Sequence, residues 1–202
     1  MTGASVLRTV IMAGHRGDGD TARAHVAHHD PTVRAAALGA LERIGALTDD
    51  ELLGAMHDVD PEVRRRVAEL LAIRPGLDLA ALLDDTDPSV VEVAAWACGE
   101  QVVVSDDVLG RVIDLTTGSD DALVREAGAA ALGAIGDERG LDAVLAACSD
   151  KPNVRRRAVL ALAPFEGERV DAAIDRALED RDWQVRQAAE DLRRAEGMID
   201  LG

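Results

Sequence analysis

The chain has 202 residues, of which 38 are Asp or Glu and 22 are Lys or Arg, so its formal net charge is −16 at pH 7. This balance argues against nucleic acid or an anionic membrane as partner, because both are held by basic side chains that neutralise phosphates. The sequence shows no apolar run long enough to span a bilayer and no convincing leader peptide. We therefore expect a cytoplasmic protein. With no Gly/Ser-rich or Pro-rich linker dividing it, we also expect one domain over residues 1–202.

The chain is built from repeats. Residues 1–18 form an apolar-periodic segment that suits an N-terminal cap helix, residues 20–196 carry six repeats, and residues 197–202 read as a tail. A motif resembling Asp-Pro-x-Val-Arg recurs through the repeats, and its valines are spaced 30, 27, 34, 30 and 31 residues apart. We call these valines the anchors: Val33, Val63, Val90, Val124, Val154 and Val185. A period near thirty residues predicts a solenoid.

Each anchor marks the start of the second helix of a repeat. The residue three positions earlier is an aspartate, which can accept hydrogen bonds from the first backbone amides of a helix. Only Lys151 breaks this rule; the aspartates are Asp30, Asp60, Asp87, Asp121 and Asp182. Apolar residues then recur at roughly +3, +4, +7, +8 and +11 from the anchor. This spacing predicts an amphipathic helix after every anchor.

Shorter apolar-periodic stretches lie between these helices and predict the first helix of each pair. They cover residues 51–57, 79–83, 108–115, 141–148 and 170–178. Thr48 and Glu51 have the spacing of a capping box. Three glycines fall where second helices should end, Gly45, Gly136 and Gly197. The predicted fold is an all-α solenoid of helix-turn-helix units.

These units resemble the HEAT family, specifically the short HEAT-like repeats named after phycobilisome lyases. The resemblance covers roughly residues 20–196 and implies a right-handed superhelix. It also implies that the arginine after each anchor pairs with the capping aspartate of an adjoining repeat, as a ladder. The matching residues are Arg34, Arg64, Arg125, Arg155 and Arg186, whereas Val91 should interrupt the ladder at the third repeat.

The resemblance places partner binding on the concave face lined by second helices, where positions +2, +6 and +10 point away from the core. In the first repeat these are Ala35, Gly39 and Arg43. Trp96 is either an exposed hot spot between Glu92 and Glu100, or it folds down over neighbouring alanines. The full predicted binding set is Trp96, Glu92, Glu100, Arg65, Glu69, Glu126, Arg156 and Leu160.

Two arginine triplets, residues 64–66 and 155–157, lie at equivalent positions of their repeats. One arginine of each triplet should serve the ladder. The other two should be available, either as a solvated edge or as a clamp for an acidic peptide across Trp96.

Residues that could carry chemistry are few. His25 and His29 would face the same side of a helix and could form half of a metal site, although a solvated face explains them equally well. Cys98 and Cys148 read as small buried hydrophobic residues rather than a disulfide.

No nucleophile motif or phosphate loop occurs in the sequence. We therefore predict a scaffold without enzymatic activity, metal or cofactor, which binds a protein or peptide. The alternative is an accessory subunit of a bilin-lyase-like or other modifying enzyme.

Overall fold

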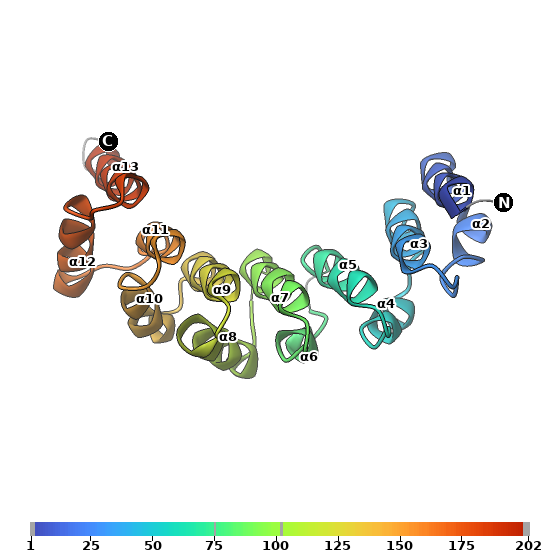
Figure 1. Cartoon of the computed structure of the whole chain (residues 1–202), viewed down its shortest axis with the longest axis horizontal. Coiled ribbons are helices and arrows are strands. Elements are labelled where there is room, and N and C mark those ends of the chain that lie inside the picture. Colours follow the sequence, from blue (N-terminus) through green and yellow to red (C-terminus); the bar gives the residue numbers. More distant parts are fainter. Residues whose placement is uncertain (1–2, 75, 102, 200–202) are drawn as a thin grey trace. The chain divides into compact units, whose positions relative to one another are not determined.

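The computed structural model describes residues 3–74, 76–101 and 103–199, with side chains described as far as residue 195. Every regular element in this described part is a helix (Figure 1). In chain order the α-helices are α1 (Gly3–Arg16), α2 (Gly19–Arg23), α3 (Pro31–Arg43), α4 (Asp49–Ala55), α5 (Pro61–Leu71), α6 (Ala80–Leu83), α7 (Pro88–Glu100), α8 (Asp106–Gly118), α9 (Ala122–Ile135), α10 (Leu141–Ala147), α11 (Pro152–Leu160), α12 (Glu168–Leu178) and α13 (Trp183–Ile199).

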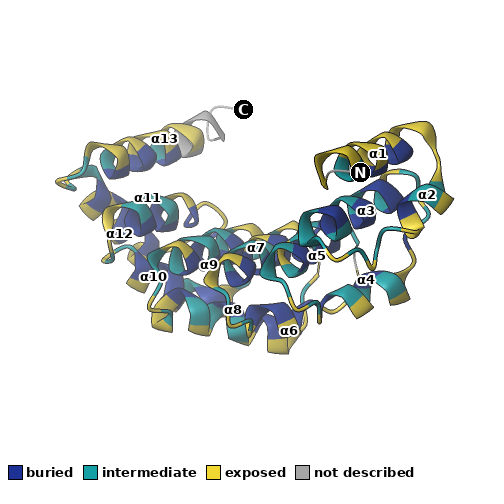
Figure 2. Ribbon diagram, turned by 45° about the vertical axis from the view of Figure 1, so that its right-hand side comes forward, coloured by how far each residue is buried: buried dark blue, intermediate teal, exposed yellow. Residues whose placement is uncertain are grey.

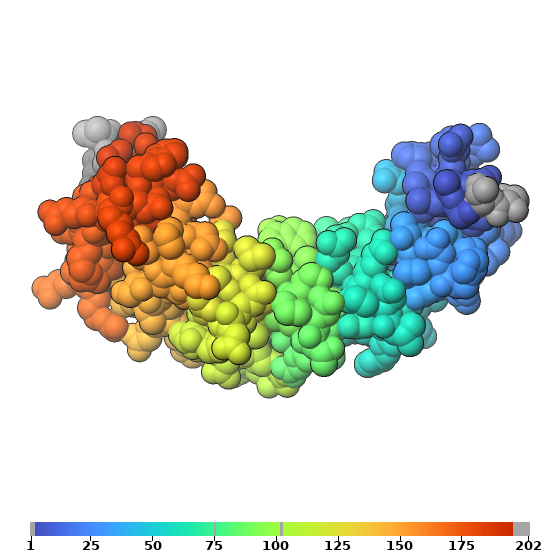
Figure 3. Space-filling model, viewed as in Figure 1, coloured from blue at the N-terminus to red at the C-terminus, as the bar shows by residue number. Residues whose placement is uncertain are grey.

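The chain divides into two compact units, Met1–Ala94 and Ala95–Gly202, and the division falls inside α7. In the first unit α1 packs on α3 and α3 packs on α5. In the second unit α9 packs on α11 and α11 packs on α13. Each of α4, α8 and α12 packs beside the second helix that follows it. Within each unit the segments therefore follow one another in chain order (Figure 3), which is the arrangement of an all-α solenoid.

The second helices begin where the anchors predicted. Each starts at the residue after the predicted cap, and where this cap is an aspartate its carboxylate accepts a hydrogen bond from a backbone amide of the first turn. Asp30 accepts from Thr32 at 3.0 Å and Asp60 accepts from Glu62 at 2.9 Å. Lys151 makes no such bond. Buried residues lie on the faces where the helices of each unit meet (Figure 2).

The first helices also lie where they were predicted, and the capping box of Thr48 and Glu51 is present at α4. Gly45 and Gly136 have positive φ of 68° and 67° and follow α3 and α9. The prediction for Gly197 was wrong, because α13 continues to Ile199. A lone glycine inside a helix costs only about 1 kcal/mol, so it does not have to end one.

Glycines set the closest crossings between second helices. A Cβ at Gly14 would lie 2.9 Å from the Cα of Ala40, and a Cβ at Gly133 would lie 2.6 Å from the Cα of Ala161. Gly133 is nine residues after its anchor and Ala161 is seven after the next one. Ser5 stands nine residues before Gly14, at the anchor position. The cap helix α1 therefore packs on α3 in the register of a second helix.

The arginine ladder exists, but its partners differ from those expected. Arg34 binds both oxygens of Asp58 at 2.8 and 2.6 Å, and Arg64 binds both oxygens of Asp85 at 2.6 and 2.8 Å. The second unit has two equivalent pairs, Arg125 with Asp150 and Arg155 with Asp180. The expected partner, the capping aspartate, was wrong: Arg34 and Arg64 bind the aspartates that stand two residues before the caps Asp60 and Asp87.

The ladder aspartate has a second role, which explains where it occurs. Asp58 also accepts the backbone amide of Asp60 at 2.9 Å, so it braces the turn before the second helix. In the first repeat His28 Nδ1 takes that amide bond, and in the fourth Ser119 takes it. The ladder arginines stand one residue after the anchors. In the helices that precede these two repeats, that position holds Val6 and Val91 instead. A carboxylate therefore stands at the turn only where the preceding repeat supplies an arginine.

Candidate functional site

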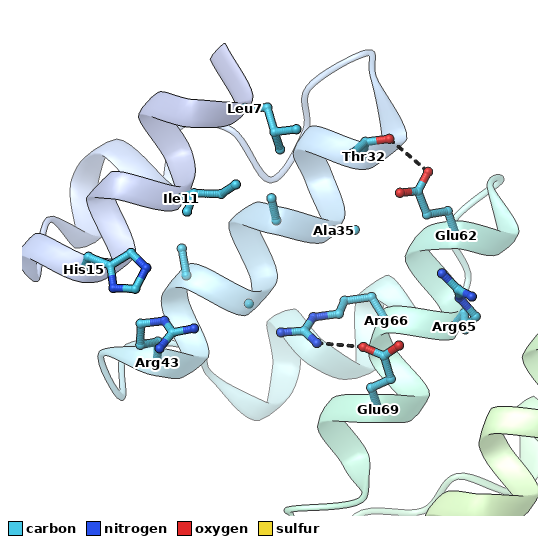
Figure 4. Close-up of a pocket in the computed structure, with 13 residues that line it drawn as sticks. Leu7, Ile11, His15, Thr32, Ala35, Arg43, Glu62, Arg65, Arg66 and Glu69 are labelled. Atoms are coloured by element: carbon cyan, nitrogen blue, oxygen red, sulfur yellow. Dashed lines mark hydrogen bonds and ion pairs between the residues drawn. The ribbon is translucent and has the colours of Figure 1, made fainter. Parts of the chain in front are cut away.

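A groove of about 370 Å³ opens on the first unit between α1, α3 and α5 (Figure 4). We call it the α1–α5 groove. Its floor is α3, which presents the small residues Ala35, Ala36, Gly39 and Ala40. Side chains of α1 stand on one side of this floor and side chains of α5 on the other. Small residues at these positions leave room above α3 for another molecule.

Arg66 narrows one end of the floor. Its guanidinium lies so close to Gly39 that a Cβ on this glycine would be 2.5 Å from Nη2. The same guanidinium donates from Nη1 to Glu69 at 2.6 Å, and the dashed line in Figure 4 marks this ion pair. Arg66 was expected to be available for a partner, and that expectation was wrong, because Glu69 stands one turn further along α5.

The α5 side of the groove carries two carboxylates that already have partners. Glu62 accepts a hydrogen bond from the hydroxyl of Thr32 at 3.0 Å, and Glu69 is paired with Arg66. Among the residues that the structure describes, the side chains of Arg43 and Arg65 make no hydrogen bond or ion pair, and both residues are exposed. With three arginines and two glutamates, the lining of the groove therefore carries a net charge of +1.

The α1 side is apolar at Leu7 and Ile11 and ends at His15. Ile11 is 46% exposed. Sequence reasoning missed these residues because it treated α1 only as a cap. Gly14 stands nine residues after Ser5, just as Gly133 stands nine residues after its anchor Val124. This shared spacing is the signal that could have identified α1 as a helix that lines the groove.

Two residues of the predicted binding set, Arg65 and Glu69, line the α1–α5 groove. The three positions of α3 that were expected to face outward differ in how far they are exposed. Gly39 and Arg43 line the groove and Arg43 is exposed, but Ala35 is buried in the floor. Ala35 is covered because α1 and α5 both pack against α3.

The other predicted residues lie further along the chain. Trp96 is 45% exposed in α7, with Glu92 and Glu100 four residues before and after it. Of the two alternatives for Trp96, an exposed ring agrees with the structure. Leu160 at the end of α11 is also exposed.

Glu126 of α9 lies between several side chains of α11. It accepts a hydrogen bond from Asn153 at 2.8 Å, and both Arg156 and Arg157 approach it to 3.8 Å. The structure thus brings Glu126 and Arg156 of the predicted set together in the second unit. Arg155, the first of that triplet, serves the ladder as predicted.

The histidines do not share a helical face. Helix α2 ends at Arg23, so His25 and His29 lie beyond it, and His25 Nδ1 bonds to the carbonyl of Thr21 at 2.8 Å. The rings of His28 and His29 lie with their centroids 4.2 Å apart and their planes tilted by 34°. Within the described residues, no three His, Cys, Asp or Glu side chains are grouped as metal ligands would be.

The comparisons with known proteins identify part of the chain. Residues 76–163 match the family model described as HEAT repeats. This segment, less than half of the chain, is similar to HEAT repeats. No curated protein matches the chain.

Solved structures show the same fold. YibA of Escherichia coli is 20% identical with a TM-score of 0.62; the match covers 79% of this chain and 62% of YibA. The complex of CpcE and CpcF of phycocyanin lyase from Nostoc sp. PCC7120 is 16% identical over 70% of this chain and 95% of that one, with a TM-score of 0.58. A designed armadillo repeat protein in complex with the peptide (KR)4 is 16% identical over 95% and 98% of the two chains, with a TM-score of 0.56.

These likenesses establish the fold, an all-α solenoid of HEAT-like repeats, which is typical of scaffolds for protein interactions. Among the described residues, no helix is both long and apolar enough to cross a membrane.

Proposed function

We propose that the protein is a non-enzymatic scaffold whose second helices bind another protein or a peptide. The observation that carries this proposal is the exposed ring of Trp96, which stands six residues after its anchor, where a second helix should face a partner. Exposed aromatic residues with charged neighbours dominate the binding energy of many interfaces. The remaining members of the proposed set are Glu92, Glu100, Arg65, Glu69, Glu126, Arg156 and Leu160.

Two likenesses support a protein partner. The designed armadillo protein is in complex with a peptide, and CpcE is in complex with CpcF. The net charge of −16 supports a protein rather than a nucleic acid, because phosphates need basic surfaces. We further propose that the whole of residues 1–202 acts as one domain.

The test is affinity purification from native extract with the wild-type protein beside Trp96→Ala. The matched control is Trp183→Ala, because Trp183 is also exposed but lies in the first turn of α13, before its anchor. We expect the Trp96 variant to lose a protein that wild type and control retain. Equal recovery by all three would remove Trp96 from the binding surface.

The alternative is an accessory subunit of a modifying enzyme, and it is favoured only by the likeness to the phycocyanin lyase complex. The same purification separates the two proposals. A second solenoid subunit or a bound pigment recovered with the protein would favour the accessory subunit.

A further inference from the structure

We infer that the α1–α5 groove is a binding site for an acidic peptide, in which an apolar side chain lies between two carboxylates. This inference rests on the proposed function, since it names the chemistry of one partner segment. It places that segment on the first unit, whereas Trp96 belongs to the second unit.

The charge of the groove is the first argument. Its lining holds three arginines, Arg43, Arg65 and Arg66, against two glutamates, Glu62 and Glu69, which gives a net charge of +1. Arg43 and Arg65 remain exposed, and neither makes an ion pair within the described part of the chain. Charges beyond about 8 Å are largely screened at physiological salt, so a ligand in the groove meets chiefly the net positive charge of the lining.

The second argument is the separation of the two arginines along and across the helices, which favours a ligand with two acidic groups. Arg43 is ten residues after its anchor and Arg65 is two after the next anchor, so they differ by eight helical positions. This is about 12 Å along the helix axes at 1.5 Å per residue. Neighbouring helices add a lateral spacing of about 8–10 Å. An extended peptide would bridge that diagonal with carboxylates about four to five residues apart.

The third argument is the apolar wall. Leu7 and Ile11 face the charged side chains of α5 across the small residues of α3 (Figure 4). A leucine-sized side chain between the two carboxylates would cover the exposed part of Ile11 and fill the space above Gly39. A peptide with two carboxylates and an apolar side chain between them therefore matches the groove better than a purely acidic peptide.

The experiment selects peptides from a randomised seven-residue library with the full-length protein. Each enriched peptide is labelled, and its affinity is measured by fluorescence anisotropy at 50 and 500 mM NaCl. We expect enrichment of peptides with two acidic residues that flank an apolar one, and at least tenfold weaker binding at the higher salt. No enrichment, or enrichment of basic peptides, would overturn the inference.

The variants place the site. Arg43→Glu with Arg65→Glu should weaken the enriched peptides at least tenfold, and Ile11→Ser should weaken them several-fold. The control Arg8→Glu changes an exposed arginine of α1 that does not line the groove. Circular dichroism should show equal helicity in all four proteins. Unchanged binding by the double variant would overturn the inference.

Trp96→Ala separates this inference from the proposed function. It should leave the groove peptides bound, because Trp96 does not line the groove. If no groove peptide exists while Trp96→Ala still loses a native partner, the scaffold proposal stands and the groove inference fails.

Discussion

Asp85 receives hydrogen bonds from two directions. Arg64 binds both carboxylate oxygens, and the amide of Asp87 donates to one of them at 2.9 Å. Only 7% of the Asp85 side chain and 14% of the Arg64 side chain is exposed. One carboxylate thus joins the turn of its own repeat to the second helix of the preceding repeat. Such a residue contributes more to stability than an exposed ion pair does.

Replacing this carboxylate should therefore be costly. We expect Asp85→Asn to lower the free energy of unfolding by about 2–3 kcal/mol, because the buried Arg64 guanidinium loses its counter-charge. The control Asp114→Asn changes an exposed carboxylate of α8 and should stay within about 0.5 kcal/mol of wild type. Urea unfolding at pH 7 measures both. Equal midpoints would show that the ladder pair adds nothing.

The ladder also predicts how stability depends on pH. Hydrogen bonds from Arg64, Arg125 and Arg155 lower the pKa values of their aspartates below 3.8. A depressed folded pKa stabilises the protein above the unfolded pKa, and this contribution is lost as pH falls through the folded value. We expect the free energy of unfolding to fall progressively below about pH 4. Asp85→Asn should show a shallower fall in urea titrations from pH 5 to 2.5, and parallel curves would contradict this.

The two cysteines give a separate residue-scale prediction. Burial raises the pKa of Cys98 to about 12 and that of Cys148 to about 11. The thiolate is the reactive form, so both thiols should be nearly inert in the native protein. We expect a thiol reagent such as DTNB to titrate no more than a small fraction of either at pH 8, and both fully in 6 M guanidinium. Rapid labelling of native Cys98 would contradict its burial.

At the scale of helices, spacing between second helices depends on residues without a side chain. Gly14 and Gly133 allow the backbone of the next second helix to approach within contact distance. Gly133 stands nine residues after its anchor, and Gly14 stands nine residues after Ser5, which occupies the anchor position of α1. The alanines that they meet, Ala40 and Ala161, are likewise equivalent. Small residues in pairs thus set how closely neighbouring repeats pack.

Two glycine substitutions separate this packing role from helix propensity. Gly133→Ala would place a Cβ 2.6 Å from the Cα of Ala161. Overpacking of this kind costs about 1–3 kcal/mol, more than the gain of up to about 1 kcal/mol in propensity. Gly110→Ala, at an exposed position of α8 with nothing within 4 Å, should instead stabilise by about 0.5–1 kcal/mol. Thermal unfolding measures both; a stabilised Gly133 variant would show that α11 can move away freely.

At the scale of the whole molecule, stability should be the sum of neighbouring contacts. The second helices of each unit contact the next one in chain order, as α9 contacts α11. In such an array a local defect weakens adjacent repeats and leaves distant ones nearly unchanged.

Hydrogen exchange tests this directly. In Gly133→Ala we expect faster exchange of amides in α9, α10 and α11, whereas α1 and α3 keep their wild-type protection. Mass spectrometry of exchanged peptides resolves the helices. A uniform increase over all helices would show that the chain unfolds as one cooperative unit instead.

Much of this protein follows from its sequence alone. The starts of the second helices, the capping box at Thr48 and the left-handed end at Gly136 depend on hydrogen bonds and backbone conformations within a few residues, which the local sequence specifies. The tertiary structure alone decided which carboxylate meets each ladder arginine and that α1 lines a groove with α3 and α5. Those contacts join residues from different helices or compete with neighbours in space, and an anchor spacing carries no information about which competitor lies nearer.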